Sequence, residues 1–204
     1  MQVLEFWFDF ASTYSYPTVM RISPLAAAHG VTVRWHPFLL GPVFQTQGLA
    51  TSPFNVFPVK GAYMLRDLQR LCRAQNLPFV WPAELNRSGG FPRRSILAAR
   101  IGLIGFDEGW GEAFARATFV AEFGHGKDIA DPAVIGKILS GLNLEPQPIL
   151  GRAQNRAVKD RLRSNTDRAI RLGIFGAPSF SIGTELFWGN DRLLAALDWA
   201  SQEK

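Results

Sequence analysis

The chain has 204 residues, of which 47% are hydrophobic and 19% are charged, a composition that excludes a disordered protein and provides for a sizeable core. The single cysteine, Cys72, excludes an intramolecular disulfide and a Cys-x-x-Cys redox pair. The net charge of +5 comes from basic residues that are scattered or alternate with acidic ones. The sequence contains no basic stripe interleaved with aromatic residues, so it does not indicate nucleic-acid binding.

The start of the chain and its hydropathy pattern predict a cytoplasmic protein. Met1 lies next to a strand-like run that contains Glu5 and Asp9, and no basic leader is present, so no signal peptide is expected. No stretch of about 18 uncharged apolar residues occurs, so no membrane span is expected either.

Residues 3–38 predict one strand-helix-strand unit. Residues 3–10 are almost continuously apolar, as in a strand that is buried on both faces. Residues 14–29 predict a helix, and residues 31–38 predict a second strand parallel to the first. Ligands bind such sheets beyond the carboxyl ends of the strands, which is where Asp9 and Ser12 lie.

The middle of the chain predicts helices. The prolines and glycines of residues 41–58 predict an irregular segment. The helices expected after it span residues 59–76, 92–105, 107–123, 132–141 and 147–172, the last as one long helix or two.

Near the end of the chain, two short strands predict a hairpin. Residues 179–182 and 185–188 are the strands, and Gly183 suits the first position of a type II′ turn between them. Pro178 cannot donate a ladder hydrogen bond, so it belongs at the first position of a strand or at an edge. If the bond before Pro178 is cis, the backbone of Ala177 turns outward and an extended ligand can pair with it.

A last helix follows the hairpin, with Asn190 or Asp191 as its predicted N-cap. The free N–H groups of such a helix suit a carboxylate, and Asp191 among them suits an amine. The sequence therefore predicts a site for an amino-acid-like group at this end of the hairpin.

The order β-α-β, then helices, then β-β-α predicts an α/β protein that resembles the thioredoxin fold with an all-helical insertion. The expected thioredoxin-like domain comprises residues 1–40 and 170–204, and the inserted helical domain comprises residues 41–169. Where the thioredoxin family carries Cys-x-x-Cys, this chain carries Ser12 and Ser15, which cannot exchange disulfides but can bind the thiolate of another molecule. Taken alone, Ser12 is more simply an ordinary helix cap.

Three motifs stand out in the sequence: FDFASTYSY at residues 8–16, FGAPSF at 175–180 and LFWGNDRL at 186–193. Together they resemble the 2-hydroxychromene-2-carboxylate isomerases, which are similar to kappa-class glutathione transferases in the DsbA-like branch of the thioredoxin superfamily. SPFN at 52–55 and GKDIADP at 126–132 also fit, so the resemblance covers nearly the whole chain.

The resemblance implies that reduced glutathione is the cofactor. Ser12 would hold and polarise its thiolate, the backbone of Ala177 before Pro178 would pair with its cysteinyl part, and Asn190 and Asp191 would receive its γ-glutamyl end. The thiolate would add to a conjugated carbon of an aromatic carboxylate substrate, allow rotation and leave again. The resemblance also implies a homodimer, and no metal site is predicted.

Lys60, Tyr63, Asp67 and Arg70 share one face of the helix predicted over residues 59–76. From spacing alone, this face is solvated and carries intrahelical pairs. The resemblance instead implies that Lys60, and with less weight Asn55, bind the carboxylate of the substrate.

Two departures from the family pattern put the substrate in question. Thr13 stands where the family usually has proline, and Arg94 stands where it commonly has asparagine. Arg94 is therefore a rival of Lys60 for the substrate carboxylate. Cys72 lies on the apolar face of its helix and is predicted to belong to the core.

Three functions remain open from the sequence. The first is a glutathione-dependent cis–trans isomerase of an aromatic 2-oxo acid. The second is a kappa-like transferase that conjugates glutathione to electrophiles or reduces peroxides. The third is a glutathione- or peptide-binding module without turnover.

Overall fold

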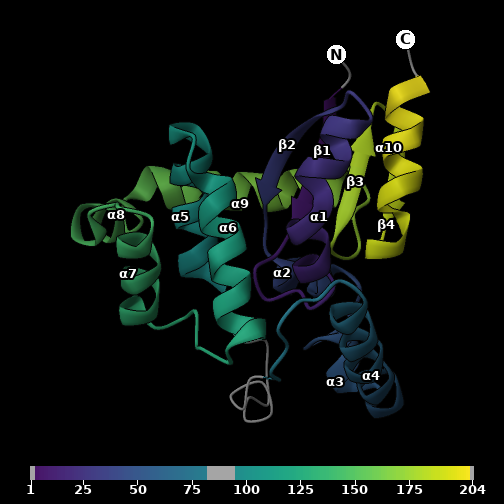
Figure 1. Cartoon of the computed structure of the whole chain (residues 1–204), viewed down its shortest axis with the longest axis horizontal. Coiled ribbons are helices and arrows are strands. Elements are labelled where there is room, and N and C mark those ends of the chain that lie inside the picture. Colours follow the sequence, from purple (N-terminus) through teal and green to yellow (C-terminus); the bar gives the residue numbers. More distant parts are fainter. Residues whose placement is uncertain (1–2, 82–94, 203–204) are drawn as a thin grey trace.

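The computed structural model describes residues 3–81 and 95–202 of the chain. At its centre is a four-stranded sheet with the strand order β2-β1-β3-β4 (Figure 1). Strand β1 (Val3–Phe8) pairs in parallel with β2 (Thr32–Pro37) and antiparallel with β3 (Ser179–Ile182). β3 pairs antiparallel with β4 (Glu185–Trp188). The parallel strand pair and the hairpin predicted from the sequence are therefore confirmed.

Helices form the remaining elements of the described chain. The helix after β1 is α1 (Ser15–Ala28), and a 3-10 turn (Asn190–Arg192) and α10 (Leu193–Gln202) follow β4. The described residues between β2 and β3 form helices and no strand. These helices are α2 (Leu40–Thr46), α3 (Pro53–Val56), α4 (Pro58–Ala74), α5 (Ser95–Glu108), α6 (Gly111–Phe119) with a π-helical turn (Val120–Gly124), α7 (Pro132–Gly141), α8 (Pro146–Arg152) and α9 (Arg156–Arg171).

Different helices cover the two faces of the sheet. Successive side chains of β1 point to opposite faces, so neighbouring residues of this strand pack against different helices. Phe6 and Phe8 lie in the main core with apolar residues of α1 and α10. Trp7 lies on the other face, where it packs with Phe38 and with Ala169 of α9. The division into a thioredoxin-like domain of residues 1–40 and 170–204 and an inserted domain of residues 41–169 stays a prediction.

The prediction of an irregular segment over residues 41–58 is wrong, because this segment contains α2 and α3. Pro53 and Pro58 are at the first positions of α3 and α4, where proline has a suitable φ and its missing N–H costs nothing. The side chain of Ser52 caps α3 by accepting a hydrogen bond from the Phe54 N–H. The prolines here therefore start helices.

Helix boundaries also differ from the prediction in the second half of the chain. The helix predicted over residues 107–123 begins only at Gly111, because the preceding helix α5 continues to Glu108. Gly109, whose φ is +83°, separates the two helices. The helix left open as one or two is two helices, α8 and α9. The predicted hairpin turn is confirmed: Gly183 has φ +56°, and Thr184 does not share a positive φ, as a type II′ turn requires.

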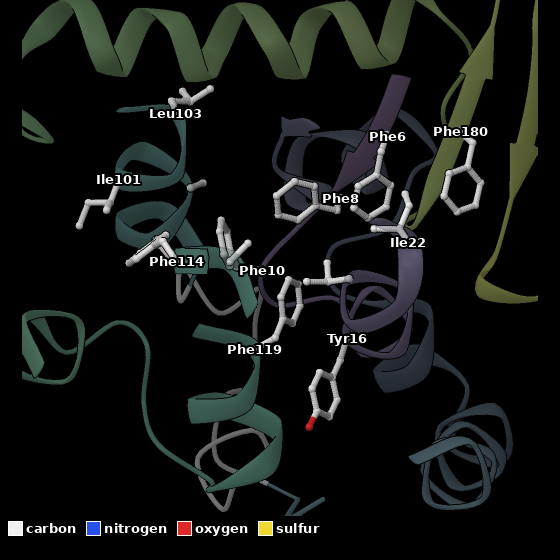
Figure 2. Close-up of a cluster of buried hydrophobic side chains, with 14 of the residues drawn as sticks. Phe6, Phe8, Phe10, Tyr16, Ile22, Ile101, Leu103, Phe114, Phe119 and Phe180 are labelled. Carbon is white, nitrogen blue, oxygen red and sulfur yellow. The ribbon is translucent and has the colours of Figure 1, made fainter. Parts of the chain in front are cut away.

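An aromatic cluster joins the sheet to the helices between β2 and β3 (Figure 2). Phe10, just beyond β1, stacks on Phe119 with ring centroids 5.4 Å apart and meets Phe114 edge-on at 5.9 Å. Tyr16 of α1 stacks on the other side of Phe119. Because Phe10 is only two residues before Ser12, this buried contact anchors the turn after β1 to α6.

Cys72 is buried in the main core, as predicted, and burial raises the pKa of its thiol to about 11. The thiol is therefore protonated at neutral pH and a poor nucleophile.

A charged cluster lies on the sheet face that α9 covers. Glu5 accepts hydrogen bonds from Arg34 and Arg168, and its Oε2 lies 2.5 Å from Nε2 of His36. The ring of His36 stacks on Trp7 with centroids 4.4 Å apart. Burial lowers the pKa of His36 to about 4, because it outweighs the opposing effect of the Glu5 carboxylate.

This shift makes the stability of the protein depend on pH. An unfolded chain binds a proton at His36 near pH 6.5, whereas the folded chain binds it only near pH 4, so stability should fall as pH is lowered between these values. Urea unfolding of the wild type and of His36→Gln at several pH values measures this, with His125→Gln as an exposed control. An equal pH slope for wild type and His36→Gln would contradict the assignment.

Candidate functional site

The site predicted from the sequence begins at the turn between β1 and α1. The N–H of Ser12 donates to the carbonyl of Asp9 at 2.9 Å, which closes a tight turn. The Ser12 hydroxyl oxygen accepts from the N–H of Ser15 at 3.3 Å, so this side chain does serve the start of α1. The N-cap position of α1 is nevertheless Tyr14, which makes no side-chain cap hydrogen bond, so Ser12 is not the ordinary cap that its position in the sequence suggested. The Ser12 hydroxyl also has a second contact.

That second contact is with the loop before β3. The Ser12 hydroxyl donates to the carbonyl of Ala177 at 3.0 Å. The Ala177-Pro178 peptide bond is cis. Within residues 3–81 and 95–202, the Ala177 N–H makes no hydrogen bond. The structure thus brings together two chain segments that the sequence analysis assigned to one site.

Trp188 of β4 forms the outer wall of this loop. A Cβ atom at Gly176 would lie 2.3 Å from Nε1 of the Trp188 indole, so only glycine leaves room for this approach. The ring of Phe175 packs on Trp188 with centroids 4.8 Å apart, and both side chains remain about half exposed. The loop beside Ser12 therefore has an exposed aromatic flank.

The prediction that Asn190 or Asp191 caps the last helix is wrong. Gly189 precedes the 3-10 turn, and no side-chain cap hydrogen bond forms there. Asn190 is only 5% exposed, and its Oδ1 accepts from the Thr18 hydroxyl at 3.0 Å and from Arg21 at 3.1 Å. Two polar side chains of α1 thus satisfy Asn190, which ties the end of the hairpin to α1.

Asp191 has the opposite environment, since its side chain is 71% exposed and lies 3.3 Å from Arg192. The negative charge of Asp191 still acts on Tyr14, in the turn that carries Ser12. Asp191 is therefore an exposed carboxylate near this turn.

Tyr14 connects the turn to α4, a contact that the sequence analysis missed. Its hydroxyl donates to Oδ2 of Asp67 at 3.0 Å, and its ring lies 6.3 Å from the ring of Phe54. Burial raises the pKa of the Tyr14 phenol, and the Asp67 carboxylate raises it further. The polar face of α4 is consequently not only solvated: Asp67 binds Tyr14 as well as lying 3.8 Å from Arg70.

The residues predicted to bind a substrate carboxylate lie on α3 and α4, which sit beyond the carboxyl end of β2 (Figure 1). Lys60 is exposed, and its Nζ lies 4.7 Å from the centre of the Phe57 ring. Asn55 is exposed and donates to the Thr51 hydroxyl at 3.0 Å. Arg94, the rival cation, lies outside the described residues.

A metal-binding cluster and a membrane-spanning helix are both absent from the described part of the chain. No group of three or more His, Cys, Asp or Glu side chains there could hold a metal ion. No helix among these residues combines the length and the apolar character needed to cross a bilayer.

Comparisons with known proteins agree with these observations. A family model, the DSBA-like thioredoxin domain, matches residues 3–198. A 2-hydroxychromene-2-carboxylate isomerase of Pseudomonas putida is 30% identical over 198 residues, which cover 94% of this chain and 90% of that protein. Glutathione S-transferase kappa 2 of Caenorhabditis elegans is 27% identical over 213 residues, 98% of this chain and 92% of that protein.

A solved structure gives the same result for the fold. The structure of a 2-hydroxychromene-2-carboxylate isomerase superposes with a TM-score of 0.82 at 27% identity and covers 97% of this chain and 93% of that one. A DsbA oxidoreductase of Streptomyces coelicolor, 18% identical, has the same fold with a TM-score of 0.77. The predicted thioredoxin-like fold is thereby confirmed. The chain belongs to the DSBA-like thioredoxin-domain family and, within it, to the family of 2-hydroxychromene-2-carboxylate isomerases.

Proposed function

We propose that this protein is a glutathione-dependent cis–trans isomerase of an aromatic 2-oxo acid. The observation that carries the proposal is the 3.0 Å contact between the Ser12 hydroxyl and the Ala177 carbonyl. It puts a hydroxyl donor just before a helix and beside a backbone N–H, that of Ala177, which has no hydrogen-bond partner among the described residues. The chain also lacks a Cys-x-x-Cys pair. Such a site suits a thiolate that belongs to a bound molecule.

The residues present fit glutathione. The N–H of Ala177 can donate a hydrogen bond to an extended peptide-like ligand. The Ser12 hydroxyl, which donates to the Ala177 carbonyl in this structure, can instead donate to the sulfur of that ligand. Asp191 offers an exposed carboxylate to an α-amino group. Asn190 fits less well as a direct ligand, because α1 already occupies its Oδ1; we propose that it positions Asp191.

Glutathione, when bound, supplies a thiolate that adds to a conjugated carbon of the substrate, so that a locked double bond becomes a rotatable single bond until the thiolate leaves again. The chain's own residues provide the surroundings. Ser12 and the first turn of α1 favour negative charge beside Ala177. Tyr14 and Asp67 hold α4 next to the turn, and the exposed aromatic flank of Trp188 covers the other side.

The second candidate is a kappa-like glutathione transferase, which the similarity to the kappa-class relatives favours. Purified protein with 2-hydroxychromene-2-carboxylate and glutathione should show isomerisation, whereas a generic electrophile in place of the chromene should react slowly. Faster reaction with the electrophile would favour the transferase. Glutathione binding without either reaction would indicate a binding module.

The substrate side of the proposal rests on α3 and α4. If Lys60 binds the substrate carboxylate, Lys60→Met should raise the KM of the substrate about tenfold, the loss of roughly 1.4 kcal/mol, and leave glutathione affinity nearly intact. Lys137→Met on α7 is the matched control, since Lys137 is also exposed. A larger effect of Arg94→Met would transfer the role to Arg94 and argue for a different substrate. The proposal includes the cytoplasmic homodimer that was expected from the sequence.

A further inference from the structure

Asp9 is a buried carboxyl group beside the Ser12 turn that the proposed function does not use. It is 3% exposed and follows β1 directly. Its Oδ1 accepts from the N–H of Ala11 at 2.9 Å, and its Oδ2 accepts from the N–H of Leu40 at 2.7 Å. The side chain of Ser95 makes a third hydrogen bond to it. Asp9 thus joins the turn to the first residues of α2 and α5.

The donors around Asp9 favour a negative charge on this carboxyl group. Each carboxylate oxygen already accepts a backbone N–H, and hydrogen bonds of this kind stabilise the ionised form. Burial is the larger influence and holds the pKa of Asp9 above its usual range. Among residues 3–81 and 95–202 no charged side chain lies against this carboxylate; it meets only the two N–H groups and Ser95.

This charge is close to the place where a thiolate would sit. The hydrogen bond from the Ser12 N–H to the Asp9 carbonyl closes a four-residue turn, in which the first and last Cα atoms are less than about 7 Å apart. Both residues are buried, so water screens the charge of Asp9 only weakly. A second negative charge at Ser12 would be repelled by it.

We propose that Asp9, in its ionised form, controls the acidity of the thiol bound at Ser12: the buried carboxylate opposes the thiolate, whereas the Ser12 hydroxyl favours it. This inference rests on the proposed glutathione site. A reversible addition needs a thiolate that both attacks and leaves, and the nucleophilicity of a thiolate falls as its pKa falls. Two opposing groups in one turn would keep the thiol near the working pH. Ser95, the first residue of α5, contributes here by holding Asp9.

The sign of one shift tests this inference. The absorbance of the thiolate in the glutathione complex is titrated against pH for the wild type, Asp9→Asn, Ser12→Ala and Ser95→Ala. Asp9→Asn should lower the midpoint by about half a pH unit or more, because a negative charge is removed. If Asp9→Asn acted only by displacing Ser12, it would instead raise the midpoint of the thiol titration, as Ser12→Ala should. Ser95→Ala loosens the same contacts but keeps the charge, so it should not lower the midpoint.

An unchanged or raised midpoint in folded Asp9→Asn would overturn the inference. If that variant does not fold, Asp9→Ser replaces it, since its hydroxyl can still accept from the Ala11 N–H. Calorimetry on the wild type separates this inference from the proposed function. No glutathione binding would overturn both, whereas binding with a lowered thiol pKa that does not respond to Asp9 would overturn only the role of Asp9.

Discussion

Ser12→Ala is expected to raise the pKa of the bound glutathione thiol by about 1–2 units and to slow isomerisation roughly 10–100-fold. The substitution removes one hydrogen bond to a charged group, which typically contributes about 1.5–3 kcal/mol, and one pKa unit corresponds to about 1.4 kcal/mol. The hydroxyl is in place for this role, because it donates across the site to Ala177 at 3.0 Å. Titration of thiolate absorbance and steady-state kinetics measure the two effects.

Ser15→Ala is the matched control for this prediction. Ser15 lies in the same turn, but its buried hydroxyl has no hydrogen-bond partner among the described residues, so its removal should leave the thiol pKa in place. If Ser12→Ala only lowers the melting temperature and its thiol titrates with the wild-type midpoint, Ser12 is a helix cap and nothing more.

Asp191→Ala should weaken glutathione binding about 10–100-fold, the loss of a hydrogen bond to a charged group worth roughly 1.5–3 kcal/mol. The stability of the free protein should change little, because Asp191 is 71% exposed and makes no cap hydrogen bond. Isothermal calorimetry measures the affinity. Asp198→Ala on α10 is the control, since Asp198 is also largely exposed and its partner is His29 rather than the predicted site. Equal affinities of wild type and Asp191→Ala would remove Asp191 from the site.

The elements that the sequence predicts well are those that depend on local chemistry. Gly173 closes α9 with φ +75°, and Gly183 makes the hairpin turn with φ +56°, conformations that few other residues adopt. The continuous apolar run of β1 predicts a strand between two covered faces, and Phe6 and Trp7 do pack on opposite sides. The prediction of an irregular segment from the prolines is wrong where a proline starts a helix, as Pro53 and Pro58 do.

The contacts that the sequence does not predict join residues far apart in the chain. Asparagine is a residue type that often caps helices, but the partners of Asn190 are Thr18 and Arg21, which come from the first helix about 170 residues earlier. Tyr14 meets Asp67 across 53 residues for the same reason. Such pairs depend on how the elements pack, and a single sequence carries no periodic signal for them.

The buried position of Asp9 was likewise not predictable from its neighbours in sequence. A single aspartate after a strand usually indicates a turn or an exposed ligand, and only the positions of Leu40 and Ser95 turn it into a buried acceptor. The pairing of Ser12 with Ala177 was anticipated because the family resemblance placed both in one site, not because spacing required it.

The most direct test of the proposed function is the rate of 2-hydroxychromene-2-carboxylate isomerisation with and without reduced glutathione, for the wild type and for Ser12→Ala. The wild type should isomerise the substrate only when glutathione is present, and Ser12→Ala should lose most of that glutathione-dependent rate. Isomerisation by the wild type at an equal rate without glutathione, or an undiminished rate in Ser12→Ala, would contradict a bound thiolate held by Ser12.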